Sequence, residues 1–220
     1  MPLNRAMTDT QKEARRADIL KVALRRFTLM PYDSLSMADT AEEAGVAKGT
    51  LYLYFKSKEE MFLAIATDEL NAWFDEVDRG LHAAGSEASI AGFVELMGET
   101  LSRRPQLLRL IAILHTVLEQ NVDYPTAKRF KTWMKQRVEK TGALLETHLP
   151  FLKPSQGAAL LLKINALVIG FQHMAEPSGV MRQVLEEEDM ALFRVDLQKS
   201  LLETLRTLLM GLMYEAKYAK

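Results

Sequence analysis

Two short helical stretches separated by one glycine constrain this chain most, and they lie within residues 36–55. Ser36 precedes the first stretch and suits a helix N-cap, because its hydroxyl can accept a bond from an unpaired backbone N–H. Gly45 follows that stretch and can adopt the left-handed conformation that ends a helix. In the second stretch Leu51 and Phe55 stand four residues apart and predict one buried face. This pattern predicts a helix-turn-helix.

The rest of the 220 residues is helical in pattern almost everywhere. Good helix formers dominate, and the alternation typical of strands is hard to find. The sequence therefore predicts an all-α fold. Helices are expected at about 10–30, 37–44, 48–54, 58–80, 86–103, 106–121, 125–148, 155–175 and 189–215.

The clearest internal boundary is a glycine-containing segment at 80–88. Helices before it are mostly short, whereas those after it are longer and richer in leucine. We expect residues 1–60 to form a three-helix helix-turn-helix DNA-binding domain, with the motif itself at about 37–55. Residues 61–84 form a connecting helix and linker, and residues 85–220 form a helical effector-binding and dimerisation domain.

Composition excludes several classes of protein. The chain has no cysteine, which removes disulfide scaffolds, thiol catalysis and cysteine-based zinc folds. Its net charge of −1 argues against a protein that coats nucleic acid through bulk charge. The charge is unevenly divided, because residues 1–58 hold 10 Lys and Arg against 7 Asp and Glu, and residues 59–220 hold 18 against 22. This division fits DNA contact through a few positioned groups.

Several polar side chains of the motif are left over once the apolar ones pack. Lysine, hydroxyl and phenol groups of this kind donate to phosphate oxygens and contact base edges. Ser57 and Glu60 form an S-x-x-E pattern that predicts a capped helix, whose first amides and Lys58 would make an anion site. The candidate DNA-binding residues are Ser36, Lys48, Gly49, Thr50, Tyr52, Tyr54 and Lys58.

The run AEEAGVAKGTLYLYFKSKEEMF, which ends at Phe62, resembles the DNA-binding module of the tetracycline-repressor (TetR) family of bacterial transcriptional regulators. The resemblance begins near Arg16 and covers the family's second and third helices and the start of the fourth. Ala47 departs from the family, which usually has serine or threonine there, so the third helix lacks a hydroxyl cap.

The resemblance implies a homodimer in which each subunit places its third helix in a major groove of double-stranded DNA. Carried over position by position, it places Ser36 on a phosphate, Lys48, Gly49 and Thr50 near bases, and Tyr52, Tyr54 and Lys58 mostly on phosphates.

Two C-terminal segments have wide apolar faces, at 157–171 and along the last expected helix. Together they exceed what one intramolecular core obviously needs; the alternative is that both belong to a monomer core. In the resembling family the last two long helices pair with their twofold mates in a four-helix bundle, which is a C2 interface. The candidate dimer-interface residues are Leu162, Leu167, Leu197, Leu201, Leu205 and Leu208.

The remaining C-terminal helices have apolar faces with a few polar groups, which suits a small-molecule pocket. For each such residue the alternative is a core position with a satisfied hydrogen bond. His115 and Glu119 have a spacing that also suits two metal ligands, but no third ligand accompanies them, so we expect no metal and no cofactor. The candidate effector-pocket residues are His115, Glu119, Trp133, Asn165 and His173.

No targeting or membrane-spanning segment is expected. The longest apolar stretch, Ala158 to Phe171, is interrupted by Lys163 and Asn165 and is shorter than the about 20 residues that cross a bilayer. We therefore expect a cytoplasmic protein without a membrane partner.

The leading hypothesis for function is a homodimeric repressor that leaves a pseudo-palindromic operator when a small apolar or amphipathic effector binds. The first alternative is a DNA-binding activator, or a regulator without a small-molecule effector. An all-helical enzyme is the weakest hypothesis, since the sequence has no G-x-S-x-G, phosphate loop, cysteine nucleophile or H-E-x-x-H.

Overall fold

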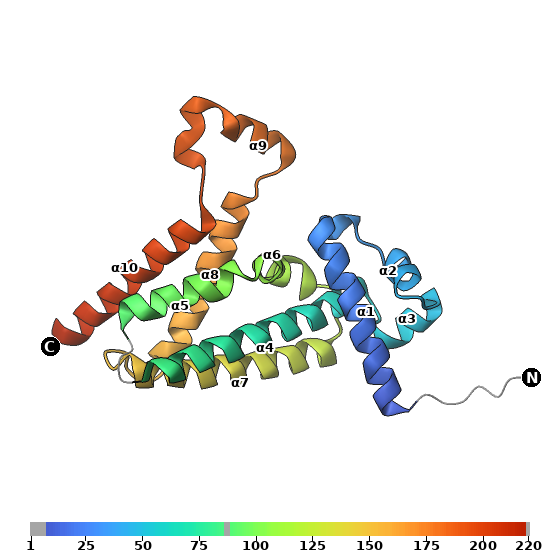
Figure 1. The fold of residues 1–220 in the computed structure, drawn as a ribbon, viewed down its shortest axis with the longest axis horizontal. Helices are drawn as coiled ribbons and strands as arrows, with labels where there is room; N and C mark the ends of the chain where they lie inside the picture. Colours follow the sequence, from blue (N-terminus) through green and yellow to red (C-terminus); the bar gives the residue numbers. More distant parts are fainter. Residues whose placement is uncertain (1–7, 86–88, 219–220) are drawn as a thin grey trace, which may run out of the picture.

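The computed structural model describes residues 8–85 and 89–218, and this part of the chain contains helices and no strand. The expected all-α fold is confirmed. A small three-helix domain lies at one end of the molecule, and the long helix α4 leads from it into a larger helical body (Figure 1). The helices are α1 (Asp9–Leu29), α2 (Met37–Glu43), α3 (Lys48–Tyr54), α4 (Lys58–Ala84), α5 (Ile90–Ser102), α6 (Pro105–Ile113), α7 (Tyr124–His148), α8 (Gln156–Ala175), α9 (Gly179–Glu186) and α10 (Leu197–Tyr218).

The helix-turn-helix forms from the local signals in its sequence. Ser36 caps α2, its Oγ accepting a hydrogen bond from the Asp39 N–H at 3.1 Å. Gly45 has a φ of 65° and ends α2 in the left-handed conformation. Leu51 and Phe55 are both buried and fasten α3 to the core of the small domain. The predicted motif is therefore confirmed.

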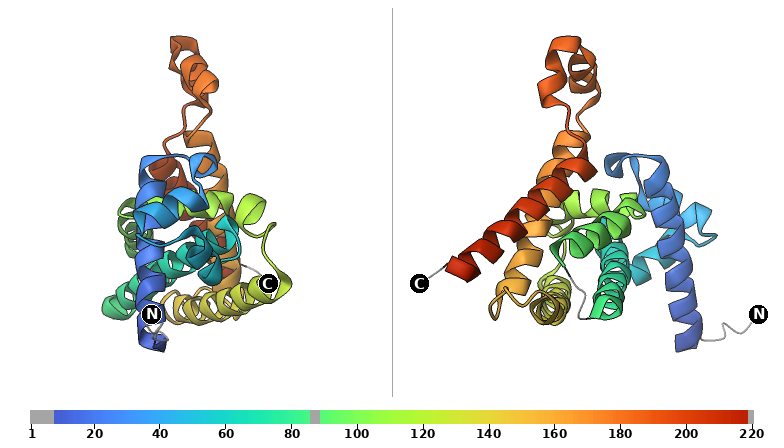
Figure 2. Two further views of the ribbon diagram at one scale, coloured as in Figure 1. Left: turned by 90° about the vertical axis from the view of Figure 1, so that its right-hand side faces the viewer. Right: turned by 60° about the vertical axis from the view of Figure 1, so that its left-hand side comes forward.

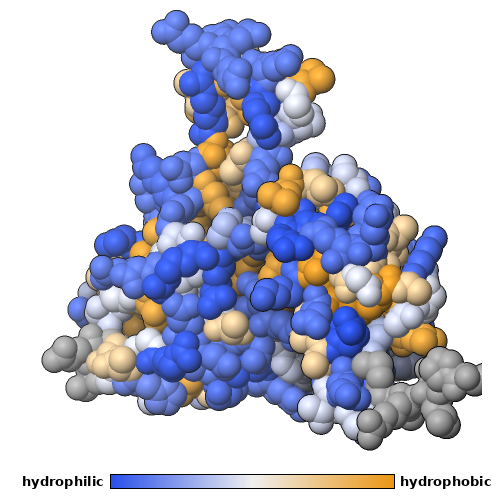
Figure 3. All heavy atoms as spheres, turned by 45° about the vertical axis from the view of Figure 1, so that its right-hand side comes forward, coloured by the Kyte–Doolittle hydropathy of each residue, from blue (hydrophilic) through white to orange (hydrophobic). Residues whose placement is uncertain are grey.

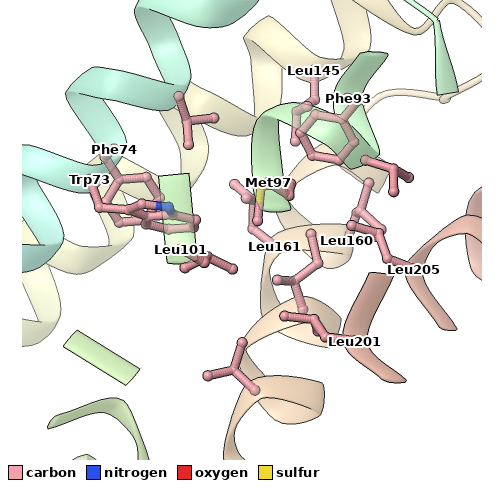
Figure 4. Packing of buried hydrophobic residues seen from close by; sticks show 14 of the residues in the cluster. Trp73, Phe74, Phe93, Met97, Leu101, Leu145, Leu160, Leu161, Leu201 and Leu205 are labelled. Carbon is pink, nitrogen blue, oxygen red and sulfur yellow. The ribbon is translucent and has the colours of Figure 1, made fainter. Parts of the chain in front are cut away.

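Two hydrophobic clusters form the core, and α4 contributes to both. Phe62 and Ile65 pack with the small domain, whereas Trp73 and Phe74 pack with α5, α8 and α10. Figure 4 shows part of this second cluster. The first cluster also contains residues from α6 and α7, such as Leu110 and Phe130. The small domain is thus packed directly on the larger helical body.

Helix α4 runs past its expected end. Gly80 was expected to begin a boundary, but it lies inside the helix, which continues to Ala84. The neighbouring Leu96 of α5 explains why a glycine stands at this helical position. A Cβ at Gly80 would lie 2.4 Å from a Leu96 methyl carbon. Gly80 therefore provides room for a neighbouring helix and does not break its own.

The last helix begins later than expected, at Leu197 rather than near 189. Asp196 explains the start, because its carboxylate accepts a hydrogen bond from the Lys199 N–H at 2.9 Å, as an N-cap does. The preceding residues form α9, which was not expected, and a 3-10 turn at Glu188–Phe193.

Residues 176–196 form an arm that projects from the body between α8 and α10, and all views show it (Figures 1 and 2). Arg194 closes the arm, because its guanidinium donates to the carbonyls of Glu186 at 3.0 Å and Glu187 at 2.7 Å. Figure 3 shows that the arm is largely hydrophilic with a few apolar residues on its surface, among which are Val180 and Phe193.

By length and composition alone, α8 is apolar enough to cross a membrane. It runs from Gln156 to Ala175, within one residue of the helix expected at 155–175. One face of α8 is buried against α6, α7 and α10, with Leu160, Ile164 and Val168 in the core. Its opposite face is exposed on this chain.

Candidate DNA-binding surface and effector pocket

Helix α3 presents its first turn to solvent. Lys48 and Gly49 are exposed, Thr50 is half-buried, and nothing lies within 4 Å of where a Gly49 Cβ would stand. Ala47 makes no side-chain cap, as its missing hydroxyl predicts. The first backbone N–H groups of α3 are therefore available beside a lysine ammonium, an arrangement that favours a phosphate or a base edge.

The two tyrosines of α3 and the serine before α2 flank this turn. Tyr52 is exposed, and Tyr54 and Ser36 are half-buried. The Ser36 oxygen accepts from the Asp39 N–H, which leaves its own O–H able to donate to a phosphate oxygen. Six of the seven predicted DNA-binding residues, Gly49 among them, are thus exposed or half-buried.

Lys58 differs from the prediction. Its ammonium donates to the backbone carbonyl of Tyr32 at 3.0 Å and to that of Leu35 at 3.1 Å, and it lies 4.0 Å from the centroid of the Tyr32 ring. Ser57 caps α4 by accepting from the Glu60 N–H, but the Glu60 carboxylate accepts from the Lys56 N–H. The ammonium therefore holds the loop before α2, and the predicted anion site at the start of α4 is not formed by it.

Replacing Lys58 by alanine is expected to lower the free energy of unfolding by about 1–3 kcal/mol, because two half-buried carbonyls lose their donor. The salt dependence of DNA binding is expected to stay unchanged, because the ammonium already donates to these two carbonyls. Urea denaturation and binding at several salt concentrations measure the two effects. A salt slope lowered by about one at unchanged stability would show that Lys58 contacts phosphate after all.

Two arginines of α1 are also engaged within the small domain. Arg26 pairs with Glu43 at 2.8 Å and with Asp39 at 3.2 Å, and Arg25 pairs with Glu43. Hydrogen bonds from Arg26 and Arg25 lower the pKa of Glu43. Both arginines therefore join α1 to α2. These ion pairs neutralise part of the positive charge of the small domain. Lys48 is therefore a larger share of the positive charge that remains for contact with DNA.

Polar contacts tie the small domain to the body. Lys56 pairs with Asp123, the N-cap of α7, at 2.6 Å. Arg109 of α6 donates to the carbonyls of Phe27 at 2.7 Å and Met30 at 3.2 Å, at the end of α1, and stacks on the Phe27 ring. No pattern in the sequence indicates which groups Arg109 contacts, so it was not among the predicted functional residues. It connects α6 directly to the DNA-binding domain.

The Lys56–Asp123 pair predicts a pH dependence of stability. The hydrogen bond from Lys56 holds the pKa of the Asp123 carboxyl well below its ordinary value, so the pair stabilises the fold above about pH 4 and is lost as the pH falls further. Asp123→Asn keeps the cap but removes the charge. Its urea midpoint should therefore lie below that of the unchanged protein at pH 7, with a smaller gap at pH 3. An equal difference in urea midpoint at pH 7 and at pH 3 would contradict the role given to the Lys56–Asp123 pair.

A cavity of about 120 Å³ lies between α4, α6, α7 and α8. Its walls are mostly apolar, and three of the five predicted residues, His115, Glu119 and Asn165, line it. Glu119 Oε2 lies 3.2 Å from His115 Nδ1, Glu119 Oε1 lies 2.8 Å from Lys131 Nζ, and Asn165 Nδ2 lies 3.4 Å from His115 Nε2. The cavity therefore has one polar wall, formed by a continuous chain of hydrogen-bonding groups.

His115 stands on a π turn, Leu114–Leu118, that follows α6. The Glu119 N–H donates to the Leu114 carbonyl at 2.9 Å, five residues back. Such turns occur frequently at functional sites. The predicted helix at 106–121 is therefore interrupted, and the interruption sets which residues face the cavity.

Two predicted pocket residues lie elsewhere. His173 places Nε2 3.2 Å from the Ala112 carbonyl and does not line the cavity, but its side chain is exposed, so it is not the core position of the alternative interpretation either. Trp133 is half-buried and lines a different hollow. Sequence reasoning missed Trp73 and Phe74 of α4, which face the cavity, because α4 was assigned to a linker.

The predicted dimer leucines divide between core and surface. Leu201 and Leu205 are 2% and 0% exposed within one chain, and Figure 4 shows them in the cluster that holds Met97 and Leu161. They are core residues, which corrects the prediction.

The other predicted leucines are less buried. Three of them are half-buried against the same cluster, namely Leu197, Leu208 and Leu167. Leu162 is exposed beside the cavity. The outward apolar residues of α10 are Met210, Met213 and Tyr214.

Metal-binding geometry is missing from the part of the chain that the structure describes. No three His, Asp or Glu side chains come close enough there to hold a metal ion. The His115–Glu119 pair stands with Lys131, whose ammonium is not a metal ligand.

A helix-turn-helix with an open third helix, joined to a helical body with an apolar cavity, is the architecture of a DNA-binding regulatory protein. Residues 19–65 match the family model described as bacterial regulatory proteins, tetR family. Residues 67–216 match the model described as tetracyclin repressor-like, C-terminal domain. The chain therefore belongs to the TetR family, whose description is of regulators and not of enzymes.

Individual relatives agree with this family. The uncharacterized HTH-type transcriptional regulator YfiR from Bacillus subtilis is 33% identical over 95 residues, which are 43% of this chain and 46% of that protein. This chain spans less than half the length of the first curated relatives it matches.

Two solved structures share the fold. The multidrug binding protein EbrR, complexed with imidazole, has a TM-score of 0.59 at 20% identity, over 90% of this chain and 94% of that one. The fatty acid degradation regulator FadR from Bacillus halodurans has a TM-score of 0.57 at 17% identity, over 90% of this chain and 95% of that one.

Proposed function

We propose that this protein is a cytoplasmic, sequence-specific DNA-binding regulator that acts as a homodimeric repressor and leaves its operator when a small apolar or amphipathic effector binds. The open first turn of α3 carries the proposal. Lys48 and Gly49 are exposed there, while Leu51 and Phe55 hold the helix rigidly from behind.

On DNA, Lys48 and Thr50 contact base edges, and Gly49 permits close approach of the backbone. Tyr52 and Tyr54 donate to phosphates on either side, and Ser36 does so from the start of α2. In the dimer the two α3 helices lie about 34–36 Å apart, which is one turn of B-DNA and implies a pseudo-palindromic operator.

The effector would act through α6 and the π turn. Leu114 belongs to the core cluster of the DNA-binding domain and also lines the cavity. Arg109 holds the end of α1 from the same segment. An effector that displaces this segment moves α1 with it, and it shifts the equilibrium only through its different affinity for the two arrangements.

The cavity limits what the effector can be in this arrangement. A cavity of about 150 Å³ holds benzene in another protein, so the about 120 Å³ here fits a molecule no larger than a single ring. A larger effector has to part α7 and α8 or move Leu162 at the exposed edge. Such an opening would bias the DNA-binding arrangement, as the repressor hypothesis requires.

The dimer would use the outer faces of α8 and α10. Met210, Met213 and Tyr214 form an exposed apolar face on α10. On α8, Ala166 and Gly170 are exposed, and a Cβ at Gly170 would meet nothing within 4 Å, so a partner helix can approach closely. The proposed dimer interface is therefore formed by these outward-facing residues and not by Leu201 and Leu205, which are buried within one chain.

The proposal is tested by footprinting on the DNA that flanks the protein's own gene. A protected pseudo-palindrome is expected at low salt, and the absence of any sequence-specific complex would refute the proposal. Lys48→Ala should weaken binding by about 1–3 kcal/mol and relax the preference at one base position. Arg79→Gln removes an exposed charge on α4, far from α3 in the sequence, and serves as the matched control.

A regulator without a small-molecule effector is the second candidate, and the small volume of the cavity is the observation that favours it. A thermal-shift screen with single-ring and larger apolar molecules separates the two. A ligand at 100 times its dissociation constant should add about 2.7 kcal/mol of stability. Stabilisation combined with release of DNA supports the effector, and a panel without any stabilising molecule supports the alternative.

A further inference from the structure

A second hollow, of about 350 Å³, lies where the DNA-binding domain meets the body. It is open to solvent and nearly three times as large as the effector cavity, within the range of small-molecule sites. Its wall is built by α1, α3, α4 and α7. A molecule bound there would touch the recognition helix and the body together.

Two guanidinium groups line the hollow, one from each side of the junction. Arg16 comes from α1 and Arg129 from α7. Within residues 8–85 and 89–218 neither forms an ion pair within 4.0 Å. Arg129 donates to the Thr126 hydroxyl at 2.9 Å, and its other N–H groups remain for a ligand.

Acidic groups offset the positive charge of the two guanidinium groups only in part. Glu60 is the acidic residue of the wall, and its carboxylate already accepts a hydrogen bond from the Lys56 N–H at 2.7 Å. Asp68 interacts with the charge of Arg16 but does not line the hollow. The wall therefore keeps an excess of positive charge, and guanidinium groups are suited to bidentate recognition of a carboxylate.

Four aromatic residues also line the hollow. Tyr54 and Phe55 enter from the end of α3, and Phe130 and Trp133 enter from α7. The rings of Phe130 and Trp133 have centroids 5.9 Å apart at an interplanar angle of 33°. Aromatic faces beside cations suit a planar molecule that carries a negative charge.

We propose that this hollow is a second small-molecule site, which binds a planar aromatic carboxylate with its ring against Trp133 and its carboxylate on Arg16 and Arg129. The site shares Phe130 with the effector cavity but is otherwise lined by different residues, and it does not depend on the proposed DNA-binding function. Its occupant would join α1 and α3 to α7, beside the Lys56–Asp123 pair. It would also contact Tyr54, one of the proposed phosphate-binding residues.

The two tryptophans make the site directly measurable. Trp133 lines the hollow and Trp73 lines the effector cavity, and the chain has no other tryptophan. 4-Nitrobenzoate, a planar aromatic carboxylate that quenches tryptophan on contact, is the probe, and 4-nitrobenzyl alcohol is its neutral counterpart. The full-length protein is titrated without DNA, so the result is independent of the proposed function.

Saturable quenching by 4-nitrobenzoate is expected in Trp73→Phe, which keeps Trp133, and not in Trp133→Phe. Arg16→Gln and Arg129→Gln should each weaken binding about fivefold or more, and the neutral alcohol should bind more weakly by a similar factor. Arg79→Gln, an exposed arginine outside the hollow, should leave the affinity unchanged.

Three outcomes would overturn the proposal. The first is quenching confined to Trp73, which would place the probe in the effector cavity. The second is equal affinity for the carboxylate and the alcohol, and the third is no saturable quenching of either tryptophan. Circular dichroism of each variant confirms that it is folded before its affinity is compared.

Discussion

Alanine at Gly157 is expected to destabilise the protein by about 3 kcal/mol or more, because the added methyl group would meet backbone atoms of a neighbouring helix. The added Cβ would lie 2.1 Å from the Gly142 carbonyl oxygen and 2.7 Å from its carbonyl carbon. Both atoms belong to the backbone of α7, which cannot rotate aside as a side chain can. The two helices would have to separate.

The contact is reciprocal. A Cβ on Gly142 would lie 2.5 Å from the Ala158 backbone nitrogen in the first turn of α8. Glu146 of α7 also accepts a hydrogen bond from the Gly157 N–H at 2.9 Å, which satisfies one of the unpaired donors at the start of α8. The glycine pair and this carboxylate therefore set where α8 begins, and α8 carries both a wall of the 120 Å³ cavity and the proposed dimer face.

Urea denaturation measures the effect, and Gly92→Ala is the matched control. Gly92 is an exposed helical glycine, and its Cβ would meet the Ser89 Oγ at an ordinary 3.4 Å. That substitution should change stability by less than about 1 kcal/mol, with a tendency to stabilise. Equal urea midpoints for the two variants would contradict the close approach of α7 and α8.

Local chemistry explains why the helix-turn-helix was predictable. Ser36 accepts its bond three residues away, Gly45 has a conformation that other residues rarely adopt, and Leu51 with Phe55 follows the helical period. Each signal acts within a few residues, so the sequence alone contains it. The role of Lys58 was missed because its partners lie 26 and 23 residues away.

The proposed effector cavity was only partly predictable for a similar reason. The π turn after α6 adds a residue to one helical turn, which rotates the following side chains by about 100° relative to a regular helix. No residue type in the run marks it. His115 and Glu119 lie at the cavity together, whereas Trp133 and His173 were assigned by composition, and their faces depend on how α7 and α8 cross their neighbours.

The apolar stripe of α10 was visible in the sequence, but its direction was not. A wide stripe can face the core or a partner, and only the packing against α5 and α8 decides which. Leucine marks the inward side here, at Leu201, Leu205 and Leu209, and methionine with tyrosine marks the outward side. The outward side therefore gives the sharper test of dimerisation.

Tyr214→Asp is expected to weaken self-association by about a hundredfold, because it places a charge at the centre of the proposed apolar interface. Tyr214 is 64% exposed in one chain, and its ring lies 4.6 Å from that of Tyr218, so the substitution disturbs no core residue. Sedimentation velocity should show a dimer become a monomer at micromolar concentration. Operator affinity should fall with it, since one α3 helix then reads only a half-site.

Two variants distinguish this result from general damage. Tyr124→Asp makes the same change at a tyrosine of α7 that is 75% exposed, and it should leave the dimer intact. Leu205→Ala should instead lower the free energy of unfolding by about 2–5 kcal/mol, because Leu205 is fully buried within one chain. The opposite result is that Tyr214→Asp stays dimeric while Leu205→Ala dissociates without loss of stability. In that case the partner contacts the leucine side of α10, and the outward face is not the dimer interface.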